Sequence, residues 1–355
     1  IYNGKGKESK KFRSLLKTLS VRQGKKFDDP SSVRQILPFI KFHSLNMEEY
    51  EDVPYKTFND FFYRRIKPGL RKPEGDSKIF VSPADSRCTV FSSIHQAKDI
   101  WIKGSRFTLA RLIKNYKSEI FNDRSCNILI FRLAPQDYHR FHCPCDAVIG
   151  KPMFVDGQYY TVNPMAIRSS LDVFGENVRM IIPLESPEFG TLLMIPIGAM
   201  MVGSIILDRK EGDFVKRGEE LGYFKFGGST VVLVVPSKAL TLDADLSKNS
   251  ADGIETLVKV GMSVGHSPRV SEHKREKIRI LNFAERERIK RTISISQENA
   301  NSLNNSTWEY HALKNMLTSE YGEEGVESLT RGDTPPSDML TRYSSSTSST
   351  SAETP

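Results

Sequence analysis

Four consecutive residues, Gly227-Gly228-Ser229-Thr230, place a hydroxyl nucleophile between two apolar segments that have strand character, 221–226 and 231–235. Two glycines before a serine leave the preceding carbonyl uncrowded and permit backbone dihedral angles that other residues avoid. The seryl oxygen is therefore placed to attack the carbonyl carbon of Gly228. The sequence predicts a serine that cleaves its own backbone.

Attack by a serine requires a base that removes its proton and a third group that orients the base. His139 and His142 are candidate bases, because histidine titrates near neutral pH and can accept or donate a proton. Asp85, in a Ser-Pro-Ala-Asp segment, is the candidate orienting carboxylate, and Asp137 is a second one. Sequence order alone does not show that these groups meet in space.

Each candidate also has a simpler interpretation. Two histidines at a three-residue spacing, followed by Cys143 and Cys145, could be metal ligands, but no second pair completes a tetrahedral set, so no metal ion is expected. An aspartate after a proline is common in turns, which is the alternative for Asp85. Isolated histidines such as His95 and His311 are typical of protein surfaces and receive no role.

Three segments in a fixed order resemble the phosphatidylserine decarboxylases. They are Ser-Pro-Ala-Asp at 82–85, Asp-Tyr-His-Arg-x-His at 137–142 and Gly-Gly-Ser-Thr at 227–230. Each segment alone is a weak signal, whereas the ordered set is specific. Gly227 stands where bacterial members usually carry leucine, and it resembles the fungal endomembrane (type II) branch. Further matches at 57–65, 160–164 and 254–261 extend the resemblance over most of residues 55–266.

The resemblance implies autocatalytic cleavage between Gly228 and Ser229, which leaves a β chain of residues 1–228 and an α chain of residues 229–355. An N-to-O acyl shift forms an ester, β-elimination breaks it, and Ser229 becomes a covalent pyruvoyl group, the pyruvate cofactor. This group is implied to form a Schiff base with phosphatidylserine and to accept the electrons released as CO2 departs. The product is phosphatidylethanolamine.

Residue roles follow from the same resemblance. Asp85, His142 and Ser229 match the charge-relay set for self-cleavage, His139 is the acid or base candidate for decarboxylation, and Asp137 is a second orienting carboxylate. Two other interpretations stay open. One is a serine hydrolase that uses Asp85, His142 and Ser229 on an external ester, although no Gly-x-Ser-x-Gly elbow surrounds the serine. The other is a noncatalytic, membrane-binding barrel module.

The elements around these residues predict an α+β fold with a mainly β core. The uncharged segment 189–207 is long enough to cross a membrane. Its proline and glycines favour two buried strands instead, at 191–195 and 200–207. The glycine-punctuated segment 212–222 is similar to biotinyl and lipoyl barrels, so we expect a barrel or sandwich that carries Ser229 on a turn or strand edge. A helix at 108–115 is expected to pack on the sheet.

The regions before and after the core differ from it in composition. Apolar residues at helical spacing predict basic amphipathic helices at 10–20 and 31–42, the second beginning at Asp29-Pro30. These helices either cover the core or lie on an anionic membrane surface. We expect a helical N-terminal region at 1–70, a catalytic core at 71–266, and a charged, then Ser/Thr-rich, mostly disordered tail at 267–355 with a basic helix at 273–292.

Composition limits the partners and the location. The 355 residues, 38% of them hydrophobic, carry a formal net charge of +8, which suits a membrane that contains phosphatidylserine. Basic, aromatic-rich recognition motifs are not evident, so nucleic acid is not an expected partner. Four cysteines without disulfide spacing indicate a reducing, cytosol-facing location, peripheral to the membrane.

The branch resemblance implies Golgi or endosome membranes. A start at Ile1 rather than methionine is consistent with a fragment of a longer protein. The expected assemblies are an α/β heterodimer from one precursor and a higher oligomer.

Overall fold

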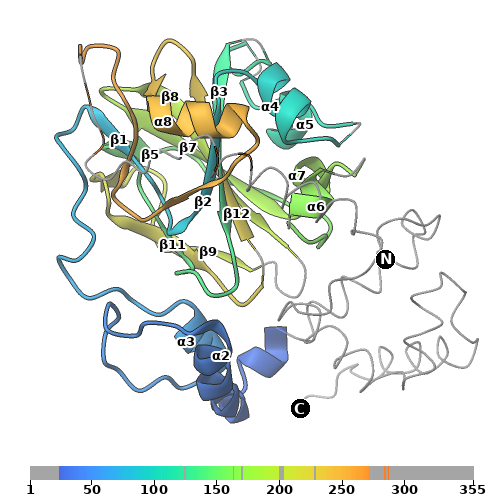
Figure 1. Ribbon diagram of the computed structural model, residues 1–355, viewed down its shortest axis with the longest axis vertical. Coiled ribbons are helices and arrows are strands. Elements are labelled where there is room, and N and C mark those ends of the chain that lie inside the picture. The colour runs from blue at the N-terminus through green and yellow to red at the C-terminus, as the bar shows by residue number, and fades with distance from the viewer. Residues whose placement is uncertain are drawn as a thin grey trace, which may run out of the picture. The chain divides into compact units, whose positions relative to one another are not determined.

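A nine-stranded antiparallel sheet lies at the centre of the computed structural model (Figure 1). The structure describes residues 24–271 except 105, 118, 124, 163, 169, 170, 200–203 and 228, together with 273, 275, 284 and 287. All of these residues belong to a unit that spans residues 16–299. The strand order is β10-β5-β7-β8-β12-β3-β2-β14, and β6 also pairs with β7. The strands are β2 (Ser86–Phe91), β3 (Cys126–Leu133), β5 (Ala147–Ile149), β6 (Met153–Val155), β7 (Arg179–Ser186), β8 (Gly190–Gly198), β10 (Phe214–Val215), β12 (Ser229–Pro236) and β14 (Thr256–Val258).

Two three-stranded sheets pack against one face of the large sheet. Their strand orders are β1-β15-β13 and β4-β11-β9. Phe80 and Phe141 from the small sheets join Leu129 and Leu233 from the large sheet in one buried apolar cluster. The arrangement is therefore a sandwich of open sheets. The added strands are β1 (Ile79–Val81), β4 (Arg140–His142), β9 (Ile205–Leu207), β11 (Glu220–Phe224), β13 (Thr241–Leu242) and β15 (Ser263–His266).

Short helices cover the large sheet on the side away from β1, as Figure 1 shows. There Arg179 in β7 donates from Nε to the carbonyl oxygen of Leu112, which ties the sheet to a helix. A further helix packs against β2, where the hydroxyl of Ser250 accepts a hydrogen bond from the Val90 N–H at 2.8 Å. The helices on the side away from β1 are α4 (Ile94–Ile100), α5 (Leu109–Leu112), α6 (Pro164–Ile167) and α7 (Val173–Glu176), and the helix against β2 is α8 (Ala244–Ala251).

The N-terminal part of the described chain consists of the 3₁₀ helix η2 (Pro30–Gln35), α2 (Ile36–His43) and α3 (Phe58–Phe62). Asp29 caps η2 by accepting a hydrogen bond from the Ser31 N–H at 2.9 Å, so the predicted helix start is confirmed. The single helix predicted at 31–42 is instead a 3₁₀ turn followed by an α-helix. The helix predicted at 108–115 is shorter because Lys114 and Asn115 have positive φ angles of 52° and 58°, which end a right-handed helix.

The predicted α+β fold with a mainly β core is confirmed. The segment 189–207 contains β8 and β9, and no helix among the described residues is long and apolar enough to cross a membrane. The helix predicted at 10–20, most of the predicted tail and Gly228 lie outside the described residues. The region boundaries at 70/71 and 266/267 stay predictions.

Replacing Leu233 by alanine tests the central position of β12. Leu233 is fully buried, so Leu233→Ala should lower the free energy of unfolding by about 2–5 kcal/mol. Leu257, in the edge strand β14, is 71% exposed, and Leu257→Ala should change the free energy of unfolding by no more than about 0.5 kcal/mol. Urea unfolding, with Ser229→Ala present in both chains so that one intact chain unfolds, measures the difference. Equal losses of unfolding free energy in the Leu233→Ala and Leu257→Ala chains would contradict the assigned strand order.

Candidate active site

Ser229 is the first residue of β12, and strands on both sides hold it. In the sheet it is opposite Leu133 of β3 and Gly198 of β8. The residue is only 1% exposed, and its Oγ has no hydrogen-bond partner among the described residues. Buried hydroxyls are normally paired, so an unpaired one marks either strain or a reactive group. Gly227, two residues earlier, has φ of 143°, which favours glycine.

Side chains alternate along a strand, which sets the direction of the Ser229 hydroxyl. Val231 and Leu233 have the same parity as Ser229 and lie in the apolar cluster between the sheets. Ser229 therefore faces the interior of the sandwich, towards β4 and β11. Thr230, whose buried Oγ1 also lacks a partner among the described residues, faces the helices.

Asp85 lies at the same end of the sheet as Ser229. It directly precedes β2, in which Arg87 is opposite Arg132 of β3, next to Leu133. Ser229 and the start of β2 are thus two strand spacings apart, about 10 Å. The Asp85 carboxylate accepts from the Val260 N–H at 2.7 Å and pairs with Arg71 at 3.2 Å. Among the described residues it makes no hydrogen bond to a histidine or to Ser229.

His139 is a buried, neutral ring with one free acceptor. Its Nδ1 donates to the carbonyl oxygen of Asp137 at 2.8 Å, because a carbonyl can only accept, and so Nε2 carries the lone pair. Nε2 is buried without a partner in the described part of the chain. Burial lowers the pKa of His139 to about 3, although the Asp137 carbonyl opposes this shift. The ring is therefore neutral at neutral pH, and its Nε2 can accept a hydrogen bond.

His142 has the same tautomer, but its acceptor is occupied. Nδ1 donates to the carbonyl oxygen of Gly218 at 2.9 Å, and Nε2 accepts from the hydroxyl of Tyr138 at 3.0 Å. The main-chain N–H of His142 donates to the carbonyl oxygen of Pro83 at 2.8 Å, which places His142 beside the segment that carries Asp85. Burial lowers the pKa of His142, while the hydrogen bond to Gly218 and the negative charges nearby oppose the shift.

The carboxylate of Asp137 does not touch either histidine. It accepts from the Ala134 N–H at 2.7 Å and pairs with Arg87 at 2.9 Å. Burial raises the pKa of Asp137, and the Arg87 charge opposes this. Asp137 thus orients His139 through its main-chain carbonyl, whereas the sequence predicted an orienting carboxylate.

Phe62 of α3 links His139 to the chain that leads into Ser229. Its ring centroid is 3.9 Å from that of His139 and 4.9 Å from that of Phe226. The main chains also converge there, because the Phe224 N–H donates to the His139 carbonyl at 2.9 Å. The structure therefore brings His139 close to the segment that ends at Phe226.

Sequence reasoning missed three contributors to the site. Phe62 and Val260 lie within segments quoted for the resemblance but received no role, and Tyr138 lies inside the Asp-Tyr-His motif itself. Only Tyr138 stood beside a candidate group in the sequence, directly before His139. Their contacts depend on packing between distant segments.

Among the residues that the structure describes, no group of three or more His, Cys, Asp or Glu side chains could hold a metal ion. Cys143 and Cys145 are buried and free, and burial raises the pKa of Cys143 to about 12.

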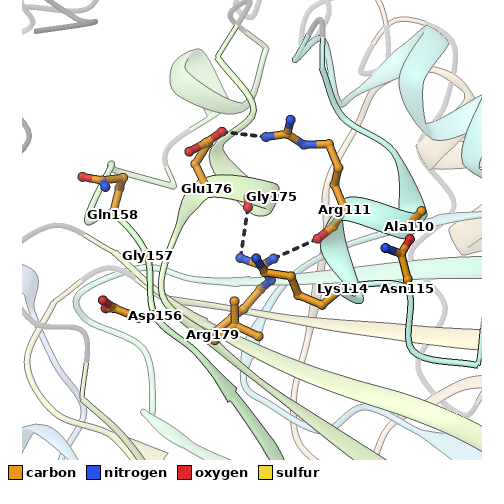
Figure 2. A pocket seen from close by; sticks show the side chains of 11 residues that line it. Ala110, Arg111, Lys114, Asn115, Asp156, Gly157, Gln158, Gly175, Glu176 and Arg179 are labelled. Carbon is orange, nitrogen blue, oxygen red and sulfur yellow. Dashed lines mark hydrogen bonds and ion pairs between the residues drawn. The ribbon is translucent and has the colours of Figure 1, made fainter. Parts of the chain in front are cut away.

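A polar cavity of about 480 Å³ lies on the helix-covered side of the sheet, beside α5 and α7 (Figure 2). The guanidinium of Arg179 donates to four carbonyl groups there, and burial lowers its pKa to about 10. Arg111 pairs with Asp172 and Glu176. Because these two arginines already have partners and Ser229 faces the opposite side of the sheet, we do not assign the cavity to the candidate active site.

The buried neutral state of His139 should make the fold sensitive to acid. The ring titrates near pH 6.5 when unfolded and near 3 when folded, so between these values the unfolded chain binds the additional proton. Stability is complete above about 6.5 and falls as the pH decreases towards 3. From about pH 7 to about pH 4.5, a chain with His139 should lose about 2–3 kcal/mol more than one with His139→Phe.

Urea unfolding at both pH values, in the Ser229→Ala background, measures this difference. His95→Phe is the control, because His95 is exposed and should follow the unchanged chain. An equal loss in the His139→Phe chain would show that the His139 ring is not held neutral by burial.

Known proteins match both the core and the flanking sequence of this chain. A family model for phosphatidylserine decarboxylase matches residues 58–266. Phosphatidylserine decarboxylase proenzyme 2 of Saccharomyces cerevisiae is 62% identical over 322 residues, which cover 90% of this chain and 28% of that protein. Phosphatidylserine decarboxylase proenzyme 3 of Schizosaccharomyces pombe is 52% identical over 264 residues, which cover 73% of this chain and 27% of that protein. The phosphatidylserine decarboxylase proenzyme of Fusobacterium nucleatum is 38% identical over 276 residues, which cover 75% of this chain and 89% of that protein.

The chain therefore spans little more than a quarter of the two fungal relatives but corresponds to most of the bacterial one. The high identity to the fungal proenzymes bears out the resemblance to the fungal branch. On the family match and these identities together, this chain belongs to the phosphatidylserine decarboxylase family.

Proposed function

We propose that this protein is a phosphatidylserine decarboxylase, a carboxy-lyase of phospholipid biosynthesis that converts phosphatidylserine to phosphatidylethanolamine and CO2. One observation carries the proposal. In a chain of this family, the hydroxyl of Ser229 is buried without a partner among the described residues, directly after two glycines. A serine hydrolase is less well supported, because a hydroxyl that is 1% exposed is closed to an external ester. A noncatalytic module would give no role to a buried serine hydroxyl that directly follows two glycines.

Maturation begins when the Ser229 oxygen attacks the carbonyl carbon of Gly228. The C–O bond forms, the C–N bond breaks, and the amine of residue 229 takes up the proton that the hydroxyl lost, giving an ester. A base then removes the Cα proton of residue 229, and the carboxylate of Gly228 leaves. Loss of ammonia upon addition of water converts the new N-terminus to a pyruvoyl group.

The residues around Ser229 fit such a group. It requires no side chain beyond that of Ser229, and the buried Nε2 of His139, in this part of the fold, has a lone pair without a partner among the described residues. The carbonyl of the pyruvoyl group would form a Schiff base with the amine of phosphatidylserine and accept the electrons that decarboxylation releases. The pyruvate cofactor thus comes from the chain itself.

We assign His142 to self-cleavage, with Asp85 as its charge partner. His142 Nε2 has the lone pair that a base needs, but the Tyr138 hydroxyl occupies it in this structure. Tyr138 must therefore release Nε2 or relay the proton from Ser229. Asp85 lies close enough to raise the pKa of His142, which helps the ring to hold the proton.

We assign His139 to decarboxylation. Phosphatidylserine brings an ammonium group that must lose a proton before its nitrogen can attack, and the free lone pair of His139 Nε2 can accept it. A substrate carboxylate beside the ring would raise the pKa of His139 and favour this transfer. Asp137 would hold the ring through its carbonyl oxygen.

The N-terminal helices offer a surface for peripheral membrane contact. Leu37 and Phe42 are 67% and 53% exposed, and the exposed cations Arg34 and Lys41 lie in the same segment. Apolar and basic side chains together favour an anionic interface, as a phosphatidylserine membrane provides. We propose a cytosol-facing location on Golgi or endosome membranes, which rests on the fungal branch resemblance.

The two fragments should stay together after cleavage. β12 belongs to the α chain, whereas its neighbours β3 and β8 belong to the β chain, and the ladders continue along most of β12. The proposed mature unit is an α/β heterodimer, and a higher oligomer remains part of the proposal. Nucleic acid is not a proposed partner.

Self-cleavage predicts two fragments on a denaturing gel, residues 1–228 and 229–355, the second with a blocked N-terminus. Ser229→Ala removes the nucleophile and should leave the chain whole. Ser237→Ala is the matched control, because Ser237 follows the same strand and its Oγ also lacks a partner among the described residues. Mass spectrometry of active protein that finds an ordinary seryl peptide across the junction would overturn the proposal.

The two histidines should separate into different steps. His142→Ala should slow self-cleavage by about 10²-fold or more, because the base is lost. His139→Ala should leave most chains cleaved but reduce kcat for decarboxylation by about 10²-fold. Pulse-chase gels and CO2 release measure the two steps, with His95→Ala as the control. Uncut His139→Ala chains beside fully cut His142→Ala chains would reverse the assignment.

A further inference from the structure

The residue before the two glycines is held by the N-terminal helical segment. The ring of Phe226 lies between three other rings, with centroid distances of 4.2 Å to Phe27, 5.2 Å to Phe58 and 4.9 Å to Phe62. All four rings are buried. We call Phe27, Phe58, Phe62 and Phe226 the aromatic clamp.

Asn59 of α3 holds the main chain at the same point. It is fully buried, and its Oδ1 accepts a hydrogen bond from the Phe226 N–H at 2.7 Å. Its Nδ2 donates to Asp28 Oδ1 at 3.0 Å. Asp28 also pairs with Lys225, at 2.9 Å, so both residues that precede Gly227 are held from the N-terminal segment.

The polypeptide is thus anchored on both sides of the scissile bond. Ser229 is held by the ladders of β12, and Phe226 is held by Asn59 and the aromatic clamp. Only Gly227 and Gly228 lie between these anchors. Holding Phe226 and Ser229 therefore fixes both ends of the segment that contains the scissile bond, whose reacting atoms must approach to about 3–3.5 Å.

We propose that Asn59 is a positioning residue for self-cleavage, which sets the scissile carbonyl by fixing the Phe226 N–H. The inference rests on the proposed function, because it concerns the rate of the proposed N-to-O acyl shift. Asn59 does not contact Ser229 through any described hydrogen bond. Its effect is transmitted by the main chain between Phe226 and Ser229.

Asn59→Ala should slow self-cleavage by about 10-fold to 10²-fold, since a displacement of about 1 Å can have an effect of that size. Asn127→Ala is the matched control. Asn127 is also buried and donates from Nδ2 to the Leu240 carbonyl, but it lies at the far end of β3, opposite Val235. Its loss should lower the thermal midpoint and leave the cleavage rate unchanged. Pulse-chase gels and thermal unfolding of each variant give both quantities.

A paired exchange distinguishes positioning from a general loss of stability. Asn59→Asp keeps an oxygen acceptor for the Phe226 N–H but sets a second carboxylate against Asp28, so cleavage should slow. Adding Asp28→Asn restores a donor opposite that carboxylate and should return the rate to within about 3-fold of wild type, the scale of one weak hydrogen bond.

Hydroxylamine identifies the step that is affected. It cleaves an ester but not the peptide bond, so chains that have completed the acyl shift are cut when it is added. Asn59→Ala chains should resist it, because their shift is slow. Cutting of these chains by hydroxylamine at the wild-type rate would overturn the positioning role.

Two further outcomes separate this inference from the proposed function. If Asn59→Ala is cut as fast as wild type, the role of Asn59 is wrong and self-cleavage stands. The same conclusion follows if Asn127→Ala, with a thermal midpoint lowered as far as that of Asn59→Ala, slows cleavage as much as Asn59→Ala does. A wild-type chain that is never cut would overturn self-cleavage, and this inference with it.

Discussion

The hydrogen bonds that hold β12 between β3 and β8 are the constraint on which the candidate site depends. They fix Ser229 at the start of a central strand, so that its hydroxyl faces the interior of the sandwich. A strand at that position cannot shift its register without moving its buried side chains to the other face of the sheet. The register of β12 thus determines which face of the sheet carries the Ser229 hydroxyl.

Burial has a second consequence, because it determines the charge state of the histidines. Both rings donate from Nδ1 to a main-chain carbonyl, which directs the lone pair of Nε2 away from that contact. Burial lowers the pKa of both rings, so they are neutral where the reaction needs acceptors. The difference between them lies in the partner at Nε2, which is the Tyr138 hydroxyl for His142 and no described group for His139.

The sequence predicted the strands β11 and β12 and the candidate groups because apolar periodicity and ordered motifs are local signals. It did not predict how those groups are held. The Asp85 carboxylate binds the N–H of Val260, which is 175 residues away, and Asp137 uses its carbonyl instead of its carboxylate. Such contacts depend on strand register and loop geometry, which no local pattern encodes. The split between η2 and α2 was missed for a related reason, since hydrophobic periodicity does not separate a 3₁₀ turn from an α-helix.

The enclosure of Ser229 bears on the order of events in the proposed reaction. In the uncut chain the residue is 1% exposed and lies between two anchored segments, so a lipid amine has no access to it. Cleavage breaks the bond between Gly228 and Ser229, while β12 and the aromatic clamp keep their separate contacts. Access of substrate to the site would then no longer require either anchor to unfold. The same packing that positions the peptide for attack by Ser229 would therefore exclude substrate until the attack is complete.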